Sequence, residues 1–531
     1  MGRDVKPLPH TLRQSMDWLH TWAGVVFSVL LFLVFFMGTL SVFDEEIDRW
    51  MMPQTRLEAV ADFSFDMQVK PHLEALAPEA KQWFVGYPSE RQPAVRIAWR
   101  EGDKLVSRFV DPASGALLPE AGSWGGTGFF FPFHYMFHIK WMDVGYWLLA
   151  VVGIGMLVLL VSGVIIHKKI FTDLFTFRPD KSRHRATLDV HNICGVLILP
   201  FHFLITLSGL IIFIFIYFKP ALPLVFGADA PKATQEVFGQ IARAPAKAPG
   251  SLAPVDPMVA EAKARWGGGN IRNLRIANPQ DKHAVVQVLR RPDDRVTYDT
   301  MNVGFDGVTG AVLGEQKALG PVVGVQRFFS GLHMIPFSHW GVRWLYFVMG
   351  LGGCVLIASG LLLWVDKREL RHVKEGRRGY RIVNAMACAG TLGVVVATLA
   401  MLVANRLLPA MENRATAEAA VYFAVWIASL LHAAWRSTGT PMSRSTWFEQ
   451  GWAVMVLAVL AVVLNGLTTG DHLLNSLARG YWPVAGADLV LLLTALIAFA
   501  VLRRQARKQK VVAAEETPPL LEARQTAESL S

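Results

Sequence analysis

The sequence predicts an α-helical polytopic membrane protein with about eight transmembrane helices and two small α+β modules on its outer side, arranged as an internal duplication. Three observations predict this fold class. Of the 531 residues, 53% are hydrophobic and only 18% are charged, which is typical of a chain that lies largely in lipid. Long apolar runs recur along the chain. Matching patterns also occur in two successive units within the first 365 residues, which indicates a repeat.

Eight apolar segments are long enough to cross a membrane as helices, for which roughly 20 residues are needed. They are residues 20–43, 143–166, 191–217, 341–364, 382–404, 419–435, 450–467 and 485–502. The segments that follow the second, fourth and eighth spans are rich in Lys and Arg, so we expect them and both termini to be cytoplasmic. We attribute the formal net charge of +10 to such segments and expect no nucleic-acid partner.

The spans and the two long outer segments give a predicted order of domains. It is a cytoplasmic N-terminus with the first span (1–43), a first outer module (44–140), the second and third spans with a basic loop (141–217), a second outer module (218–338), the fourth span (339–365), a four-helix membrane extension (366–504) and a cytoplasmic tail (505–531).

The two outer segments have similar local patterns. Each contains a helix-like stretch, "DMQVKPHLEALA" or "PMVAEAKARW", and then a strand-like alternation, "AVRIAW" or "HAVVQVL". Each ends in an Asp-initiated turn, "FVDPASGALLP" or "GFDGVTGAVLG", in which Gly115 or Gly310 can supply a positive φ. We interpret them as two copies of one α+β module.

The repeat continues into the membrane spans. The run from His20, "HTWAGVVFSVLLFLVFFMGTLSVF", matches the run from His191, "HNICGVLILPFHFLITLSGLIIF". With one-residue gaps, the second and fourth spans also match. The aligned pairs are Gly24 with Gly195, Gly38 with Gly209, His138 with His333, Gly145 with Gly341, and Ser162-Gly163 with Ser359-Gly360. In a parallel duplication, equivalent residues lie at one depth, so we expect His20 level with His191 and His138 level with His333.

Two histidine pairs, each at one level, are what bis-histidine ligation of haem iron requires. A histidine at a helix end can also be a polar group that reaches the lipid headgroups. His134 could replace His138, and His339 could replace His333. The two levels lie on the order of 25–30 Å apart, which is long for one electron-transfer step.

His202 is a further candidate because it lies in the middle of an apolar span, where ionisable groups tend to be functional. On a straight helix it would lie about 16 Å from His191 on the same side. The first repeat has Leu31 at the matching position. Either His202 holds or flanks an intermediate carrier, or one histidine pair is structural.

These residues resemble the PepSY-associated transmembrane proteins, often called iron-regulated membrane proteins. The resemblance rests on "LHTWAG" at 19–24, "DVHNICGVLILPFH" at 189–202 and the two Asp-initiated turns, and it covers roughly residues 15–370. It implies periplasmic PepSY-like modules and an inner-membrane siderophore-iron reductase with one or two non-covalent b-type haems. The implied axial ligands of the haem iron are His20, His138, His191 and His333, with His202 as a further cofactor-binding residue.

The expected function is electron transfer from a quinol or a cytoplasmic reductase to a ferric siderophore or other ferric chelate, which releases Fe(II) during iron uptake. No CxxCH motif for covalent haem and no GxGxxG nucleotide fingerprint occurs in the sequence. Two alternatives remain: a non-redox membrane protein that binds peptides or regulates a peptidase, and an iron-chelate transporter, for which a two-unit repeat would be natural.

Overall fold

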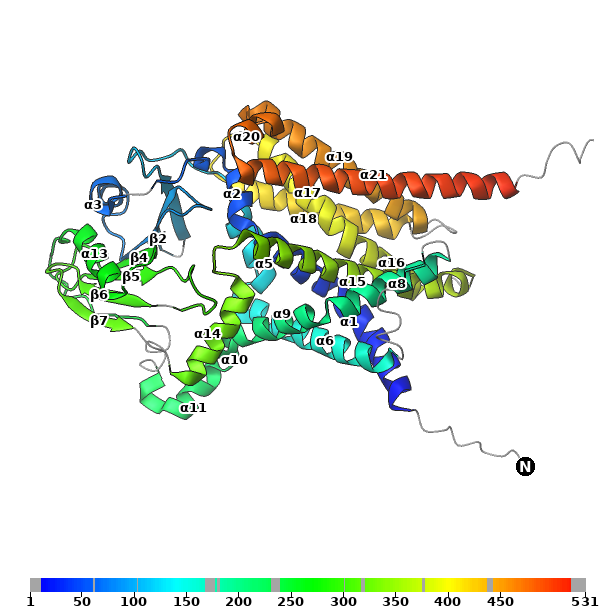
Figure 1. Ribbon diagram of the computed structural model, residues 1–531, viewed down its shortest axis with the longest axis horizontal. Coiled ribbons are helices and arrows are strands. Elements are labelled where there is room, and N and C mark those ends of the chain that lie inside the picture. Colours follow the sequence, from blue (N-terminus) through cyan, green and yellow to red (C-terminus); the bar gives the residue numbers. More distant parts are fainter. Residues whose placement is uncertain are drawn as a thin grey trace, which may run out of the picture. The chain divides into compact units, whose positions relative to one another are not determined.

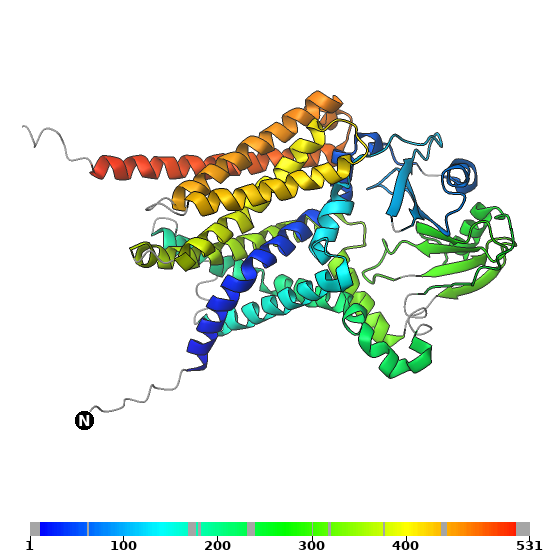
Figure 2. The ribbon, with the colours of Figure 1, turned by 180° about the vertical axis from the view of Figure 1, so that it is seen from behind.

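The computed structural model describes residues 11–60, 63–102, 104–167, 177–178, 182–230, 239–299, 301–316, 320–374, 378–436 and 443–516. Most of the predicted basic loop between the second and third spans, and the end of the predicted tail, lie outside the described residues. The chain forms two compact units (Figures 1 and 2). Unit 1 is Met1–Leu370 with Ala410–Ala415, and unit 2 is Arg371–Pro409 with Thr416–Ser531.

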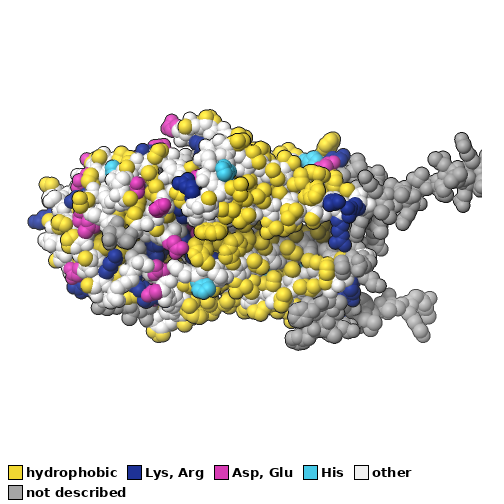
Figure 3. All heavy atoms as spheres, turned by 45° about the horizontal axis from the view of Figure 1, so that its top comes forward, with side chains coloured by type: hydrophobic (Ala, Val, Ile, Leu, Met, Phe, Trp, Pro, Cys, Tyr) yellow, Lys and Arg dark blue, Asp and Glu magenta, His cyan; other side chains and the backbone are white. Residues whose placement is uncertain are grey.

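Within the described residues, seven helices are long and apolar enough to cross a membrane, or eight if one bent pair counts as a span. In unit 1 they are α1 (Leu12–Ser41), α6 (Val144–Ile166), the bent pair α8 (Arg183–Leu197) and α9 (Leu199–Ile212), and α15 (Trp340–Lys374). Helix α1 packs against α6, and α6 packs against α9. Hydrophobic side chains cover most of the long helices on the face in Figure 3. The chain is thus a multi-pass membrane protein, as predicted.

The predicted span 191–217 is not one straight helix. Helices α8 and α9 meet at 62°. Ile198 lies between them with φ −98° and ψ 3°, and Pro200 lies in the first turn of α9. Proline lacks the N–H that would continue the hydrogen-bond ladder, and its ring clashes with the carbonyl four residues earlier. The straight-helix geometry expected for His191 and His202 is therefore wrong.

Short helices connect the membrane helices to the part of unit 1 that contains the β-sheet, which we call the outer part. They are α2 (Asp44–Met51), α5 (Phe131–Met136), α10 (Ile214–Tyr217), α11 (Leu222–Phe226) and α14 (Pro321–Met334). A five-residue π-helix, Gly126–Phe130, leads directly into α5. Helix α5 packs against α1, and α14 packs against α9.

The outer part of unit 1 is built on one antiparallel sheet of seven strands, in the order β3-β2-β1-β4-β5-β6-β7. The strands are β1 (Gln82–Gly86), β2 (Val95–Glu101), β3 (Lys104–Val110), β4 (Ile271–Ala277), β5 (Val285–Arg290), β6 (Asn302–Asp306) and β7 (Val312–Gln316). Both predicted modules contribute, because β1 pairs with β4 through registers such as Trp83 with Ile276. The two segments therefore share one sheet and one hydrophobic core rather than forming two separate bodies.

Three short helices, α3 (Phe65–Gln68), α4 (Lys70–Leu76) and α13 (Val255–Arg265), pack on this sheet. Each segment caps the other: the carboxylate of Asp66 accepts hydrogen bonds from the backbone N–H groups of Val255 and Asp256. In return, Asp256 accepts from the N–H groups of Phe65 and Asp66. A carboxylate at a helix N-terminus satisfies unpaired donors there, so these contacts hold the two segments together.

Both predicted Asp-initiated turns are present. The carboxylate of Asp111 accepts from the N–H of Ala113, that of Asp306 accepts from Val308 and Thr309, and Gly115 and Gly310 have positive φ. The chain after Gly310 forms strand β7. The chain after Gly115 makes only one bridge, between Val110 and Leu117, because Pro119 soon follows and cannot donate to a ladder.

Unit 2 consists of α16 (Arg378–Cys388), α17 (Val394–Leu407), α18 (Arg414–Arg436), α19 (Ser443–Thr469), α20 (Leu473–Ala478) and α21 (Trp482–Glu516). The first residues of α18 belong to unit 1. Hydrogen bonds between buried side chains join its helices, Asn405 to Glu418 at 2.8 Å and Asn465 to Asp488 at 3.3 Å. The expected four-helix extension thus has four long apolar helices.

Candidate functional site

Two pairs of histidines lie face to face or edge to face in unit 1. The inner pair is His20 on α1 and His191 on α8, whose ring centroids are 6.4 Å apart at an interplanar angle of 81°. The outer pair is His134 on α5 and His333 on α14, 5.9 Å apart at 23°. The predicted proximity of His20 and His191 is confirmed.

The predicted pairing of His138 with His333 is wrong, and His134 takes that place. Helix α5 ends at Met136, and both Phe137 and His138 have positive φ. The His138 ring therefore turns away, where its Nε2 bonds the carbonyl of Phe129 at 2.9 Å and Trp124 lies near it.

The error comes from the alignment of the two helix ends. In the structure, "HYMF" of α5 corresponds to "HMI" of α14, and each helix ends in a left-handed residue, Phe137 or Ile335. When Phe137 is aligned with Ile335, His134 aligns with His333 and Tyr135 is one extra residue in α5. His339, the other alternative, lies at the start of α15, where its Nδ1 accepts from the N–H of Val342.

All four paired histidines use Nδ1 in the same way. Nδ1 lies 3.0 Å from the carbonyl oxygen of Leu159 for His20, 3.0 Å from that of Leu356 for His191, 2.8 Å from that of Val34 for His134 and 2.9 Å from that of Ile205 for His333. A carbonyl oxygen can only accept, so each Nδ1 carries the proton and each Nε2 has a free lone pair. Among the described residues, no Nε2 of these four rings makes a hydrogen bond.

Each ring also lies against a glycine four residues after its carbonyl partner. A Cβ atom would lie 2.7 Å from the His134 ring at Gly38, 2.9 Å from the His333 ring at Gly209, 3.1 Å from the His191 ring at Gly360 and 3.2 Å from the His20 ring at Gly163. Only glycine permits such close approach of a ring to a helix backbone. Three of these glycines follow a serine, and Ser162, Ser208 and Ser359 all contact the same Nδ1 atoms.

The spacing within each pair would allow its two imidazoles to hold one metal ion between them. Metal–imidazole bonds are about 2 Å long, so two imidazoles on opposite sides of one metal have centroids about 6 Å apart. Two rings that present only acceptor lone pairs cannot hydrogen-bond to each other, whereas a metal ion between them suits both. The carbonyl bonds at Nδ1 are the usual outer partners of ligating histidines. No group of three or more His, Cys, Asp or Glu in the described ranges suits a metal ion by itself.

His202 is fully buried, with 0% of its side chain exposed. Its ring packs edge-on against Phe35 of α1 at 5.7 Å, and a Cβ at Gly353 of α15 would lie 3.2 Å from its Nε2. Neither ring nitrogen has a hydrogen bond of normal geometry among the described residues, although the backbone of Met349 is close. Among the described residues, no second histidine ring is paired with that of His202.

A cavity of about 1270 Å³ extends from the outer histidine pair to the sheet. His134, His333, Gly38 and Gly209 line it in the helical part, and residues of β1, β3 and β4 line it at the other end. This volume exceeds the roughly 300–1,000 Å³ of most small-molecule pockets, so the cavity has room for a large flat cofactor and a second ligand.

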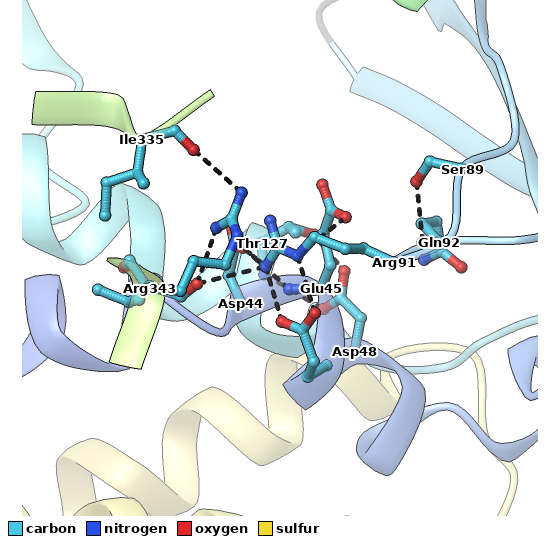
Figure 4. Close-up of polar contacts among 12 residues, drawn as sticks. Asp44, Glu45, Asp48, Ser89, Arg91, Gln92, Thr127, Ile335 and Arg343 are labelled. Atoms are coloured by element: carbon cyan, nitrogen blue, oxygen red, sulfur yellow. Dashed lines mark hydrogen bonds and ion pairs between the residues drawn. The ribbon is translucent and has the colours of Figure 1, made fainter. Parts of the chain in front are cut away.

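Charged side chains gather where α1 continues into α2, beside this cavity (Figure 4). Arg91 forms ion pairs with Asp44 at 3.2 Å, Glu45 at 3.6 Å and Glu46 at 2.7 Å. Burial raises the pKa of Asp44 to about 6, with Arg91 opposing the shift. Burial also raises the pKa of Asp48 to about 8, although Asp48 accepts hydrogen bonds from the hydroxyl and N–H of Thr127.

Sequence reasoning missed this charged group and ranked His134 only as a substitute. A signal for the histidine contacts was available in the repeated Ser-Gly pairs, Ser162-Gly163, Ser208-Gly209 and Ser359-Gly360. Each pair marks a helix turn in which a backbone carbonyl accepts a hydrogen bond from a histidine Nδ1. Gly38, which follows Met37 instead of Ser, marks the fourth such turn.

Comparison with known proteins agrees with this architecture. The model of the PepSY-associated TM region matches residues 18–367, about two thirds of the chain. An uncharacterized protein of Pseudomonas aeruginosa, PA4219, is 26% identical over 393 residues, which cover 70% of this chain and 92% of that relative. The chain belongs to the family of proteins with a PepSY-associated transmembrane region.

Proposed function

We propose that the protein carries electrons across the membrane through two b-type haems and reduces a ferric chelate at its outer side. The inner haem would be held by His20 and His191, and the outer haem by His134 and His333. The observation that carries this proposal is the shared geometry of the four rings, in which every Nδ1 donates to a backbone carbonyl and every Nε2 is left to bind a metal. Haem supplies the one-electron chemistry.

His202 lies between the two pairs and is part of the proposed route. Along α9, Gly209 beside His333 follows His202 by seven residues, or about 10 Å of helix rise. Along α15, Gly360 beside His191 follows Gly353 beside His202 by seven residues, again about 10 Å. Imidazole is neither oxidised nor reduced at the potentials of haem, so this ring would fill the path between the two sites without carrying an electron itself. We propose that His202 flanks the route rather than binding an iron, because no second histidine faces it among the described residues.

The cavity supports reduction at the outer end. It leads from the outer histidine pair to the sheet, so a chelate bound there can approach the cofactor without entering lipid. One electron converts Fe(III) to Fe(II), for which siderophores have low affinity. We propose a quinol or a cytoplasmic reductase as the electron donor at the inner end. A quinol would give up two electrons and two protons and so would reduce two Fe(III) ions in succession.

The proposed setting is the bacterial inner membrane, with both termini in the cytoplasm and the sheet in the periplasm. The basic residues that follow α6 and α15 support this orientation by the positive-inside rule. The two segments that share the sheet, with their reciprocal Asp66 and Asp256 caps, support the proposal that they arose by duplication.

The test is an anaerobic stopped-flow experiment on the purified protein in lipid nanodiscs. The haems are first reduced, then mixed with a ferric siderophore in the presence of a dye that traps Fe(II). We expect oxidation of the haem α-band and one Fe(II) for each electron, and loss of fast Fe(II) formation in His333→Ala but not in His138→Ala. A haem that stays reduced in the presence of excess ferric chelate would refute the proposal. Uptake of radiolabelled iron into sealed vesicles without reduction would favour a transporter.

A further inference from the structure

Arg343, near the start of α15, is a buried cation at the outer end of unit 1. Its side chain is only 7% exposed. Its guanidinium donates to two backbone carbonyls, Nη1 to Val42 at 3.3 Å and Nη2 to Ile335 at 3.0 Å (Figure 4). No carboxylate of the described residues lies within 4 Å of it.

The carboxylates nearby are already committed to another arginine. Asp44, Glu45 and Glu46 all pair with Arg91. Arg91 also donates through Nη2 to the carbonyl of Val42 at 3.3 Å, so two guanidinium groups share one oxygen. Arg343 therefore has a second cation beside it and no ion pair within 4 Å in the described part of the chain, although the charges of the three carboxylates also act on it.

The two carbonyls that Arg343 binds belong to the outer histidine site. Val42 follows the end of α1, four residues after Gly38, against which the His134 ring lies. Ile335 follows the end of α14, two residues after His333. Arg343, His134 and His333 all line the same cavity.

With no carboxylate bound to it directly, the buried Arg343 guanidinium can take up an anion that enters the cavity. The planar guanidinium group can bind both oxygens of a carboxylate or of a phosphate through two parallel hydrogen bonds. A carboxylate is therefore a suitable anion for Arg343. Carboxylates can come from two sources here, the propionate groups of a haem and the carboxylates of a chelate.

We propose that Arg343 binds a carboxylate in the outer cavity, and that this carboxylate is a propionate of the outer haem. This inference rests on the proposed function, because it requires a haem at His134 and His333. The haem is favoured as the source because both carbonyl contacts of Arg343 lie beside the outer pair. Ile335 follows the helix that carries His333, and Val42 follows the helix whose Gly38 lies against the His134 ring. A purely structural role is the alternative, since a cation stabilises helix C-termini.

The experiment compares haem b with its dimethyl ester, whose propionates carry no charge. Apoprotein with His191→Ala, in which the outer pair is the complete one, is titrated with each haem by absorbance. The same titration is done with Arg343→Gln, with Arg343→Lys and with Arg275→Gln, a half-buried arginine that does not line the cavity. Gel filtration and thermal unfolding check that each variant is folded.

We expect the parent protein, which carries only His191→Ala, to bind haem b at least tenfold more tightly than the dimethyl ester. Arg343→Gln should weaken haem b binding about tenfold, leave ester binding unchanged and move the midpoint potential of the outer haem to a more negative value. Arg343→Lys, which keeps the charge and offers a safeguard if Arg343→Gln fails to fold, should retain part of the preference for haem b. Arg275→Gln should behave as the parent.

Equal discrimination by the parent and Arg343→Gln would overturn the proposal, as would equal binding of both haems by the parent. If Arg343→Gln leaves haem binding unchanged but weakens binding of ferric citrate, and not of a carboxylate-free hydroxamate chelate, the anion belongs to the substrate and the propionate assignment is wrong. Absence of bis-histidine haem in every variant would refute the proposed function itself, and this inference with it.

Discussion

The inner and outer histidine pairs have the same ligand chemistry but different surroundings. His20 and His191 lie on candidate membrane spans, α1 and the bent pair of α8 and α9, whereas His134 and His333 lie on α5 and α14, which are not among the candidate spans. The outer pair lines the large cavity, and the inner pair is not among its lining residues. The two pairs thus share the same carbonyl and glycine surroundings, whereas only the outer pair borders the cavity.

The largest effect should come from removing one imidazole at a time, which tests whether the two pairs are separate sites. His134→Ala or His333→Ala should lower the haem content from two to one per chain, since each axial bond is lost with its side chain. His20→Ala or His191→Ala should also remove one haem, but the inner one. His138→Ala is the matched control and should keep both. The pyridine haemochromogen assay gives the ratio, and haem loss in His138→Ala with full retention in His134→Ala would reverse our assignment.

Filling the space beside a ring should disturb one site and spare the other. In Gly38→Val or Gly209→Val, the added atoms would lie within 3 Å of the His134 or His333 ring, so we expect more than half of the outer haem to be lost. Gly24→Val on α1 is the control, because a Cβ there meets only Leu159 at 3.9 Å. Low-temperature EPR of the two low-spin signals checks the result. Equal loss of both signals would show that the substitution acts on the whole bundle.

A buried acid near the outer cavity should make stability depend on pH. The pKa of Asp48 is raised from 3.8 to about 8, so the folded state holds a proton that the unfolded chain releases. Stability from this group is then complete below about pH 4 and falls as the pH rises toward 8. Asp48→Asn should flatten the decrease of several degrees in Tm that we expect between pH 5 and 8. An unchanged pH profile in Asp48→Asn would contradict this assignment.

The smallest effect should come from the serines that assist Nδ1. Ser208→Ala removes a hydroxyl 3.1 Å from His333 Nδ1 and leaves the Ile205 carbonyl in place. A neutral hydrogen bond contributes on the order of 1 kcal/mol, so we expect a small shift in the midpoint potential of the outer haem alone. Ser359→Ala should shift the inner haem instead. Spectroelectrochemical titration resolves the two, and a shift of both by either variant would argue against local action.

Much of this architecture could be predicted because hydrophobic length and charge bias act locally along the sequence. The apolar runs, the Asp-initiated turns with Gly115 and Gly310, and the proximity of His20 and His191 follow from periodicity and repetition. Pro200 signals the bend at Ile198, whereas the apolar run by itself predicts one straight span. The single seven-stranded sheet depends on the long-range pairing of β1 with β4, which no local pattern specifies.

The outer site could be predicted only in part. The choice between His134 and His138 depends on where α5 ends and on two left-handed residues, Phe137 and His138, and a helix end is uncertain by about one turn from sequence alone. The Arg91 and Arg343 contacts join α1, β-sheet loops, α14 and α15, so they appear only once these segments are packed.

The most direct test of the central claim is the haem content and ligation of the full-length protein, purified from cells well supplied with haem. Absorbance, haemochromogen assay and EPR should give two b-type haems per chain, both low-spin with two histidine ligands, and one should disappear in His134→Ala. A colourless protein that binds no added haem would contradict the account, and so would haem that stays at full occupancy when His134 and His191 are both replaced by Ala.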